Sequence, residues 1–382
     1  MKKGLGKVVA GLVCVTALLS TSQVALAEEQ KENYLIGFEE EEAVELFSQE
    51  VESVGTFSLD GEAQEDEGVD VDIIHDYDLI PALSVELDPE DVESLSEESG
   101  ISYIEEDHEV TTMQQSVPWG IQRVQAPAAN NRGFTGAGVQ VAVLDTGIAS
   151  HSDLNIRGGA SFISGEPSTS DNNGHGTHVA GTIAALNNST GVVGVAPRAE
   201  LYAVKVLGAD GSGSISSIAR GLEWAANNNM DIANMSLGSA SPSITLERAV
   251  NQATNQGVLV VAASGNSGAS SLSYPARYQN AMAVGATDRN NNRASFSQYG
   301  AGLDIVAPGV GVQSTYLANR YASLSGTSMA TPHVAGVAAL VKQKNPSWSN
   351  SQIRNHLNST ATNVGNAQFY GNGLVNADAA TR

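Results

Sequence analysis

Cysteine is almost missing from this chain of 382 residues, whose one cysteine is Cys14. Because Cys14 lies in an N-terminal stretch that we expect to be removed, the mature protein has no disulfide and must be stabilised by its core or by metal ions. Hydrophobic residues make up 41% of the chain, which is ordinary for a soluble globular protein and enough for a sizeable core. No internal repeat, coiled coil or nucleic-acid-binding motif stands out.

Long hydrophobic runs are also missing. The apolar run near the N-terminus extends from Val8 to about Leu19, whereas a membrane-spanning helix needs roughly 20 apolar residues. Lysines precede this run, and the small residues Ala25-Leu26-Ala27 follow it, which is the layout of a secretory signal peptide. Cys14 lies inside the run and not at its end, which argues against a lipoprotein signal. We therefore expect residues 1–27 to be removed and the protein to be secreted.

Basic residues are scarce in the segment that follows. Residues 28–113 contain 30 Asp and Glu against one Lys, whereas residues 114–382 contain 12 acids against 15 Lys and Arg. Such an asymmetry marks separate units with different fates. Strand-like alternation over residues 82–87 and an acidic helix start at residues 89–95 predict a small α/β unit, marginally stable because its carboxylates repel. The alternative is a solvated acidic linker.

After Gln114 the chain becomes rich in Gly, Ala, Ser and Asn, and apolar strands alternate with helical segments. Strands are predicted over residues 139–144, 201–206 and 258–263, and helices over residues 215–227 and 245–256. This order indicates a mostly parallel sheet covered by helices on both faces. In such α/β sheets, functional sites form at the carboxyl ends of the strands.

Three polar motifs fall where such a site would lie. Asp145 ends a buried strand in VLDTGI, His175 enters an apolar helix in NGHGTHVAG, and Ser328 begins another helix in SGTSMATPH. Singly, the Asp could be a turn former and the Ser a helix cap. His175 and His178 could be zinc ligands, but no cysteine or helical His-x-x-x-His set completes such a site. Together, in the order Asp, His, Ser, the motifs predict an activated serine nucleophile.

These motifs, with Asn266 in ASGNSG, resemble the subtilisin family, and residues 114–382 match it end to end. The likeness extends to the high-alkaline subtilisins of alkaliphilic bacilli. It implies a three-layer α/β fold, with a mostly parallel sheet between helices, preceded by a small α/β propeptide that acts as chaperone and temporary inhibitor. It also implies a signal peptide (1–27), a propeptide (28–113) and a mature protease domain (114–382), with self-processing between Met113 and Gln114.

The resemblance assigns roles to the motif residues. Ser328 would attack the peptide carbonyl to form an acyl-enzyme, His175 would carry the proton, and Asp145 would fix the imidazole. The Ser328 N–H and the Asn266 amide would stabilise the oxyanion. The expected activity is that of a secreted, broad-specificity endopeptidase acting on polypeptides. Alternatives are a narrow processing protease and a catalytically silent peptide-binding protein.

A substrate groove is implied by the same resemblance. Two glycine-rich segments would sandwich an extended peptide as an added strand, and an S1 pocket based near Ser273 would accept a large apolar side chain such as that of Met113. Ile215 leaves the preference at S4 open. The expected substrate-binding residues are Gly211, Ser212, Gly213, Ser236, Leu237, Gly238, Ala263, Ser264 and Gly265.

Structural calcium is the implied cofactor, because oxygen-only ligation suits this ion. The alternative for the loop over residues 186–192 is a plain Asn-rich turn. The peptide bond Tyr274–Pro275 is expected to be cis. The implied ligands are side-chain oxygens of Gln115, Asp153 and Asn188 and carbonyls of Leu186, Thr190 and Val192, with a second, weaker cation site near Ala276, Tyr278 and Ala281.

The charged residues after residue 113 suggest an alkaline working range. They include 12 Arg and only 3 Lys, and Arg stays charged above about pH 10.4, where Lys begins to lose its proton. Since His175 must be neutral to act as a base, activity should rise through about pH 6–8. We expect a monomer that binds polypeptide substrates and its own propeptide, with no nucleic-acid partner and no membrane association after signal removal.

Overall fold

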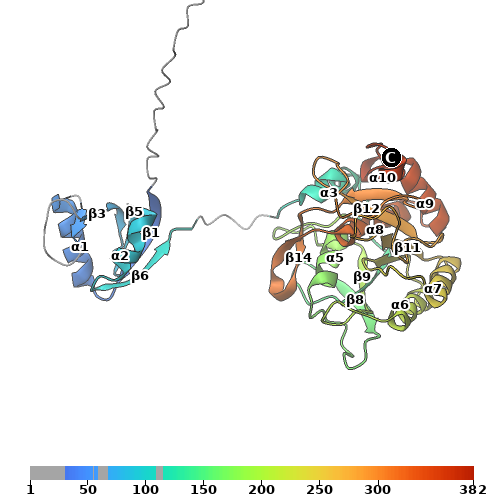
Figure 1. Cartoon of the computed structure of the whole chain (residues 1–382), viewed down its shortest axis with the longest axis horizontal. Helices are drawn as coiled ribbons and strands as arrows, with labels where there is room; N and C mark the ends of the chain where they lie inside the picture. Colours follow the sequence, from blue (N-terminus) through green and yellow to red (C-terminus); the bar gives the residue numbers. More distant parts are fainter. Residues whose placement is uncertain (1–30, 55, 59–67, 109–114) are drawn as a thin grey trace, which may run out of the picture. The chain divides into compact units, whose positions relative to one another are not determined.

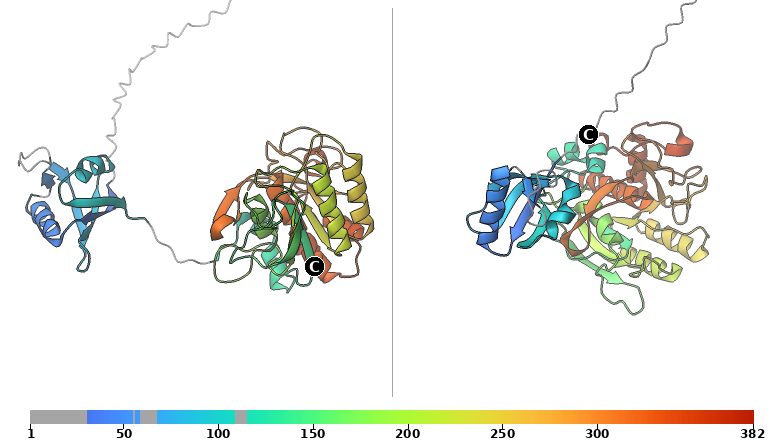
Figure 2. Two further views of the ribbon diagram at one scale, coloured as in Figure 1. Left: turned by 90° about the horizontal axis from the view of Figure 1, so that it is seen from below. Right: turned by 60° about the vertical axis from the view of Figure 1, so that its left-hand side comes forward.

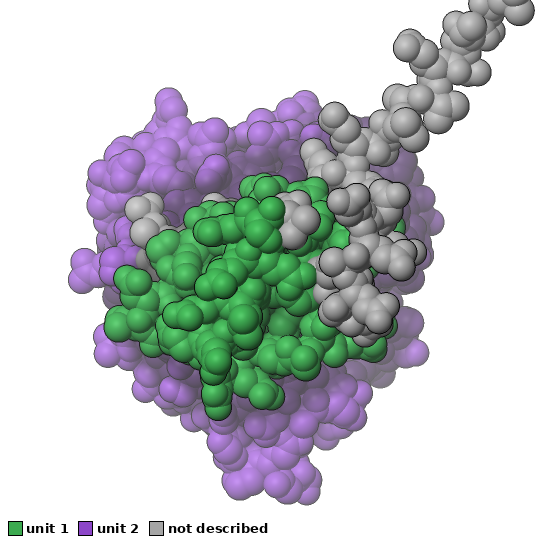
Figure 3. Space-filling model, turned by 90° about the vertical axis from the view of Figure 1, so that its left-hand side faces the viewer, with its two compact units in different colours: residues 1–111 green, residues 112–382 purple. Residues whose placement is uncertain are grey.

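The computed structural model describes residues 31–54, 56–58, 68–108 and 115–382. The chain divides into two compact units, Met1–Thr111 and Thr112–Arg382 (Figures 1 and 3). The expected signal peptide (1–27) and the expected cut between Met113 and Gln114 lie outside the described residues. Within the described ranges, no helix has the length and apolar character needed to cross a membrane.

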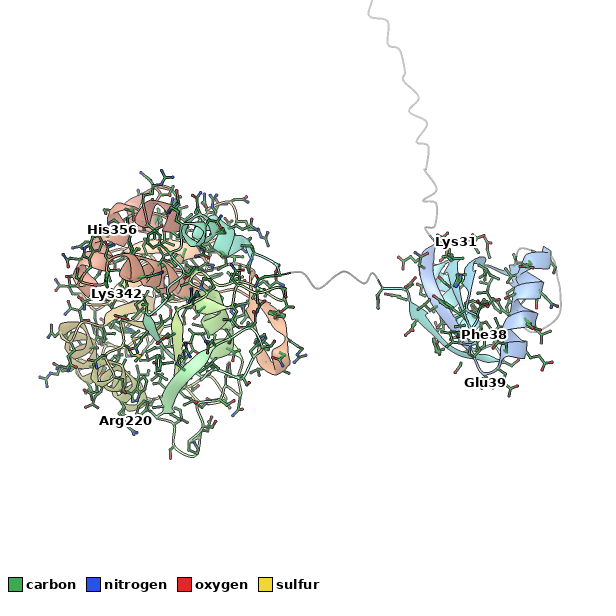
Figure 4. The ribbon with its side chains drawn as sticks, turned by 180° about the vertical axis from the view of Figure 1, so that it is seen from behind. Lys31, Phe38, Glu39, Arg220, Lys342 and His356 are labelled. Atoms are coloured by element: carbon green, nitrogen blue, oxygen red, sulfur yellow. The ribbon has the colours of Figure 1, made fainter. Side chains whose placement is uncertain are left out.

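The first unit is a four-stranded antiparallel sheet packed against a helix. The sheet order is β4-β5-β1-β6, and β5 has the bounds that the alternation predicted. Phe38 at the end of β1 contacts Phe47 of α1, with ring centroids 5.3 Å apart (Figure 4). Ile36, Leu83 and Val85 are fully buried, so this segment has a core and is not a solvated linker. Its elements are β1 (Glu32–Phe38), α1 (Glu41–Val54), β2 (Thr56–Ser58), β3 (Gly68–Asp70), β4 (Asp72–Asp76), β5 (Ala82–Leu87), the 3-10 helix η2 (Pro89–Asp91), α2 (Val92–Ser96) and β6 (Ile101–Glu106).

The second unit contains a seven-stranded sheet in the order β13-β12-β11-β10-β7-β9-β8, with every neighbouring pair parallel. The strands predicted over residues 139–144, 201–206 and 258–263 are β7, β9 and β11, and the two predicted helices are α6 and α7. Its elements are α3 (Trp119–Arg123), α4 (Ala126–Asn131), β7 (Gln140–Asp145), β8 (Ile156–Ser161), α5 (His175–Ala184), β9 (Glu200–Lys205), α6 (Ile215–Asn227), β10 (Ile232–Met235), α7 (Ile244–Asn255), β11 (Leu259–Ala263), β12 (Met282–Thr287), β13 (Ile305–Pro308), β14 (Val312–Thr315), the 3-10 helix η3 (Leu317–Asn319), β15 (Tyr321–Leu324), α8 (Thr327–Lys344), α9 (Asn350–Ser359), α10 (Ala367–Tyr370) and α11 (Ala377–Ala380).

Helices cover both faces of this sheet because successive strand residues point to opposite sides. Val141 and Val143 of β7 pack in the core that contains α5 and α8. Ala142 and Leu144 pack in the other core, with α6 and α7, which lie side by side in Figure 2. The three-layer α/β fold is therefore confirmed.

The carboxyl end of the sheet gathers chemically active side chains. Asp145 is the last residue of β7, whose neighbours in the sheet are β9 and β10. β9 ends at Lys205, opposite Asp145, and Ser236 directly follows β10. A site at this edge follows from the parallel arrangement.

Candidate active site

Asp145 and His175 form the centre of the site. The Nδ1 atom of His175 lies 2.7 Å from Oδ1 of Asp145 and donates to it, since an ionised carboxylate can only accept. The Asp145 side chain is fully buried, whereas 27% of the His175 side chain is exposed. The buried carboxylate thus fixes the imidazole tautomer and leaves Nε2 as the ring atom available to take up a proton.

Thr146 and Asp171 hold this pair in place. The Thr146 N–H donates to Asp145 Oδ1 at 2.8 Å, and the Thr146 hydroxyl donates to Asp171 Oδ1 at 2.8 Å. Gly176, in the first turn of α5, donates its N–H to the same hydroxyl at 3.0 Å. Thr146 therefore joins the end of β7 to the beginning of the helix that carries His175.

Ser328 lies in the first turn of α8, where backbone N–H groups point outward and favour negative charge. Its hydroxyl donates to the Ser236 carbonyl at 3.1 Å, and the Ser236 hydroxyl donates to the Ser328 carbonyl at 2.8 Å. In the described part of the chain, the hydroxyl of Ser328 is thus bonded to the strand end and not to His175. Catalytic hydrogen bonds are often poorly aligned in structures without substrate and tighten when substrate binds.

Asn266 lies beside the beginning of α8. Its Oδ1 accepts from the Thr327 N–H at 2.9 Å and from the Thr327 hydroxyl at 2.8 Å. Because both lone pairs of Oδ1 are occupied, the amide can offer only its NH₂ group to a ligand. This orientation suits a donor to a developing negative charge.

A cleft of about 530 Å³ adjoins His175. The six residues predicted at the two edges all line it, and so does Ile215. Its lining is Thr146, Asn173, His175, Leu207, Gly211, Ser212, Gly213, Ile215, Ile218, Ser236, Leu237, Gly238, Ser239, Leu246 and Tyr274.

The predicted S1 residues lie together. A Cβ atom on Gly238 would sit 3.3 Å from Cβ of Ser273, and one on Gly265 would clash with the side chains of Ser273 and Gln298. Gly265 has a φ of 111°, a conformation that favours glycine. Ala263 and Ser264 are buried behind them at the end of β11. Glycine at position 265 therefore allows Ser273 and Gln298 to pack directly against the backbone, and residues 263–265 are not among those that line the cleft.

Helices α5 and α8 contain three histidines, and the pKa of His175 shifts in the opposite direction from those of His178 and His333. Burial acts to lower the pKa of His175, but the charge of Asp145, its hydrogen bond and the charge of Asp171 outweigh burial and raise it. Burial lowers the pKa of His178 in α5 and of His333 in α8 to about 4 each. His178 Nε2 lies 2.9 Å from the Val312 carbonyl, so the hydrogen bonds of His178 are structural.

The loop predicted to hold calcium forms a cage of oxygen atoms. The Gln115 amide nitrogen lies within 3.3 Å of four acceptors, which are the carbonyls of Leu186, Thr190 and Val192 and Oδ1 of Asn188. An NH₂ group has only two protons to donate, so the oxygens outnumber its donors. An oxygen set of this kind fits a hard cation such as calcium.

The other expected ligands have mixed outcomes. Asp153 is buried and accepts from Asn188 Nδ2 at 2.8 Å, which places its carboxylate at the edge of the cage. Near the expected second cation site, the Tyr278 carbonyl accepts from the Ala281 N–H at 3.0 Å, and the site itself, with Ala276, stays a prediction. The Tyr274–Pro275 peptide bond is cis, as predicted.

The sequence motifs did not identify several residues of the site. Thr146 and Asp171 belong to the hydrogen-bond network around His175, and Gln298 contacts Ser273 at 3.1 Å. Lys205 is fully buried at the end of β9. Of these residues, only Lys205 could have been predicted from the sequence, because a lysine at the end of an otherwise apolar strand needs a polar partner when it is buried.

Comparisons with known proteins agree with this geometry. Residues 136–373 match the family described as Subtilase family, and residues 33–113 match Peptidase inhibitor I9. The chain is 71% identical to M-protease of Shouchella clausii and 68% identical to alkaline elastase YaB of a Bacillus species, over 100% of the chain and of each protein. It is 81% identical to subtilisin Savinase of Lederbergia lenta over 70% of the chain and 100% of that protein.

Proposed function

The chain belongs to the subtilase family and is a serine endopeptidase of the alkaline subtilisin type, made with an inhibitory propeptide; from this premise we propose that Asp145, His175 and Ser328 are its catalytic triad. Nε2 of His175 takes the proton of the Ser328 hydroxyl during attack on the peptide carbonyl and then delivers it to the leaving amine. Asp145 keeps Nδ1 protonated and stabilises the imidazolium. The bond of 2.7 Å between Asp145 and His175 is the observation that carries this assignment.

The tetrahedral intermediate needs hydrogen-bond donors for its oxyanion. The backbone N–H of Ser328 at the beginning of α8 and the NH₂ group of Asn266 supply them. Thr327 holds the carbonyl of the Asn266 amide through two bonds, so the amide is oriented before substrate arrives. A preoriented donor stabilises the transition state because it does not have to reorganise as charge develops.

The substrate is an extended polypeptide that adds a strand between Gly211–Gly213 and Ser236–Gly238. Main-chain pairing of this kind gives affinity with little demand on sequence, which favours broad specificity. The P1 side chain is proposed to bind near Gly265 and Ser273, where the neighbouring side chain of Gln298 is also uncharged. Large apolar P1 residues therefore fit best.

Calcium would be structural here. Gln115, Asn188 and the carbonyls of residues 186, 190 and 192 would hold it, with Asp153 at the edge of the cage. Bound calcium supplies positive charge that offsets the repulsion of the converging oxygens. The second site near Ala276, Tyr278 and Ala281 is proposed as a weaker cation site.

The precursor is proposed to process itself. Residues 1–27 would direct secretion, residues 28–113 would inhibit and assist folding, and residues 114–382 would be the mature, monomeric enzyme, which acts outside the cell and does not bind membranes. The acidic composition of the middle segment and its match to Peptidase inhibitor I9 support this division.

The test is the intact mass of the secreted product, with wild type beside Ser328→Ala. We expect wild type to lack residues 28–113 and the variant to keep them attached. Asn366→Ala, at the N-cap of α10, serves as the control and should be processed like wild type. Equal processing of wild type and Ser328→Ala would refute self-cleavage, and casein hydrolysis by Ser328→Ala would refute the assigned nucleophile.

A further inference from the structure

Lys205 is an unusual residue for a protein core. Its side chain has an exposed fraction of 0%, although lysine is almost never fully buried without a partner. Its ammonium group has two: the Thr146 carbonyl at 2.7 Å and Oε2 of Glu166 at 3.0 Å. The side chain of Glu166 is 30% exposed, so the pair links a buried strand end to the surface of the unit.

The first partner of Lys205 leads to the triad. Thr146 donates its N–H to Asp145 and accepts from Gly176 at the beginning of α5 through its hydroxyl. Lys205 holds the carbonyl of the same residue. The N–H, hydroxyl and carbonyl of Thr146 are therefore all hydrogen-bonded, and the bond to the carbonyl depends on Lys205.

The second partner leads to the substrate cleft. Glu166 accepts from the Ala209 N–H through Oε1 at 3.3 Å. Ala209 lies two residues before Gly211, and the tight turn between them is closed by the Gly211 N–H, which donates to the Gly208 carbonyl at 2.9 Å. The segment Gly211–Gly213 lines the cleft. The contacts with Lys205 and with the Ala209 N–H lower the pKa of the Glu166 carboxyl. The ion pair between Lys205 and Glu166 thus joins the edge of the cleft to the triad.

We propose that Lys205 and Glu166 are positioning residues that transmit the binding of a peptide at the Gly211–Gly213 edge to the alignment of Asp145 and His175. The inference rests on the proposed triad and deepens it. A peptide that pairs with this edge would displace Ala209. The path from Ala209 to Thr146 consists of a hydrogen bond to Glu166, the ion pair between Glu166 and Lys205, and the hydrogen bond from Lys205 to the Thr146 carbonyl. An extended substrate would gain turnover from this path, whereas a substrate that occupies S1 alone would not.

A purely structural role predicts a different behaviour. Replacement of a buried ion pair by apolar residues is often neutral or stabilising, whereas removal of one partner leaves an unpaired charge. A structural pair should therefore be replaceable as a unit without loss of function. A pair that transmits position should not be replaceable in this way.

The experiment compares kcat and KM for two anilide substrates with the same P1 phenylalanine, one acylated directly and one extended to P4. The variants are Glu166→Gln, Lys205→Met and the double variant Glu166→Leu/Lys205→Met, in which apolar residues replace the pair. Titration of the active site with an acylating inhibitor counts competent molecules, so misfolded protein does not enter kcat. The control is Lys342→Met, near the end of α8, which removes a lysine whose partner Asp231 lies 3.6 Å away (Figure 4).

In wild type we expect extension of the substrate to P4 to raise kcat. We expect Glu166→Gln to reduce this gain in kcat by about tenfold. With the Gly211–Gly213 edge misplaced relative to the triad, binding of the P2–P4 residues no longer helps to position the scissile bond. The double variant should recover the thermal stability lost in Lys205→Met but not the gain in kcat. Lys342→Met should keep the gain of wild type.

The proposal is overturned if Glu166→Gln keeps the wild-type gain within about twofold, or if the double variant restores it. Glu166 is partly exposed, so its variant tests the path even if Lys205→Met does not fold. Failure of the proposed triad would look different, since Ser328→Ala would then hydrolyse the short substrate at the wild-type rate.

Discussion

The second unit should lose stability in mild acid because of His178 and His333. Both side chains are fully buried, in the two helices that carry His175 and Ser328. Their pKa values fall from 6.5 in the unfolded chain to about 4 in the folded protein. Between these values the unfolded chain binds protons that the folded protein does not, so stability is fully present above pH 6.5 and is lost as pH falls toward 4.

The size of this effect follows from the shifts. A difference of about 2.5 in pKa corresponds to about 3 kcal/mol for each histidine, at about 1.36 kcal/mol per unit. At pH 5, about 2 kcal/mol of it is already lost. Each histidine then contributes a slope of about 1 kcal/mol per pH unit to the free energy of unfolding between about pH 4.5 and 6.

The perturbation is His333→Gln, which removes one titrating group, measured in a Ser328→Ala background so that autolysis does not interfere. Calorimetric unfolding between pH 4.5 and 7.5 gives the dependence on pH. We expect the variant to lack about 1 kcal/mol per pH unit of the parent's slope, whatever its stability at neutral pH. Thr331→Val, a buried change in the same helix, should lower stability equally at all pH values. Parallel curves for His333→Gln and its parent would refute the reasoning.

Three further predictions concern the site. The raised pKa of His175 places the acid limb of kcat/KM above pH 6.5, and Asp171→Asn, which removes one of the charges that raise it, should move the limb to lower pH; an unmoved limb would contradict this. Gly265→Ala should reduce hydrolysis after phenylalanine about tenfold more than hydrolysis after alanine, because its Cβ would force the side chains of Gln298 and Ser273 to shift at the proposed S1 site; an unchanged ratio of the two rates would disprove that assignment of S1. A chelator should lower the melting temperature of wild type more than that of Asn188→Ala, and equal decreases would argue against calcium in the cage.

The local elements were readable because they are properties of short stretches of chain. The helix predicted over residues 215–227 is α6 with the same bounds, since its capping serine and apolar spacing are both local. β5 likewise agrees with the alternation over residues 82–87. β7, β9 and β11 are each shifted by one residue or shortened, which reflects that strand ends depend on pairing with a neighbour.

The partners within the site were less readable. The sequence indicated that Ser328 begins a helix, but not that its hydroxyl is bonded to the carbonyl of Ser236. It indicated that His178 follows His175 by three residues, but not that the pKa of His178 falls to about 4. Both facts depend on atoms contributed by distant segments, and no spacing along the chain encodes them.

By itself, the sequence determined the contrast between an acidic segment and a glycine-rich domain, the α/β class and the three motifs of the site, because composition and periodicity reflect which residues are buried. The tertiary structure decided the strand order, which sets β7 between β9 and β10. That order brings Lys205 opposite Asp145 and Ser236 to the beginning of α8. Parallel buried strands all share one apolar pattern, so their order is fixed only when the helices and both cores pack together.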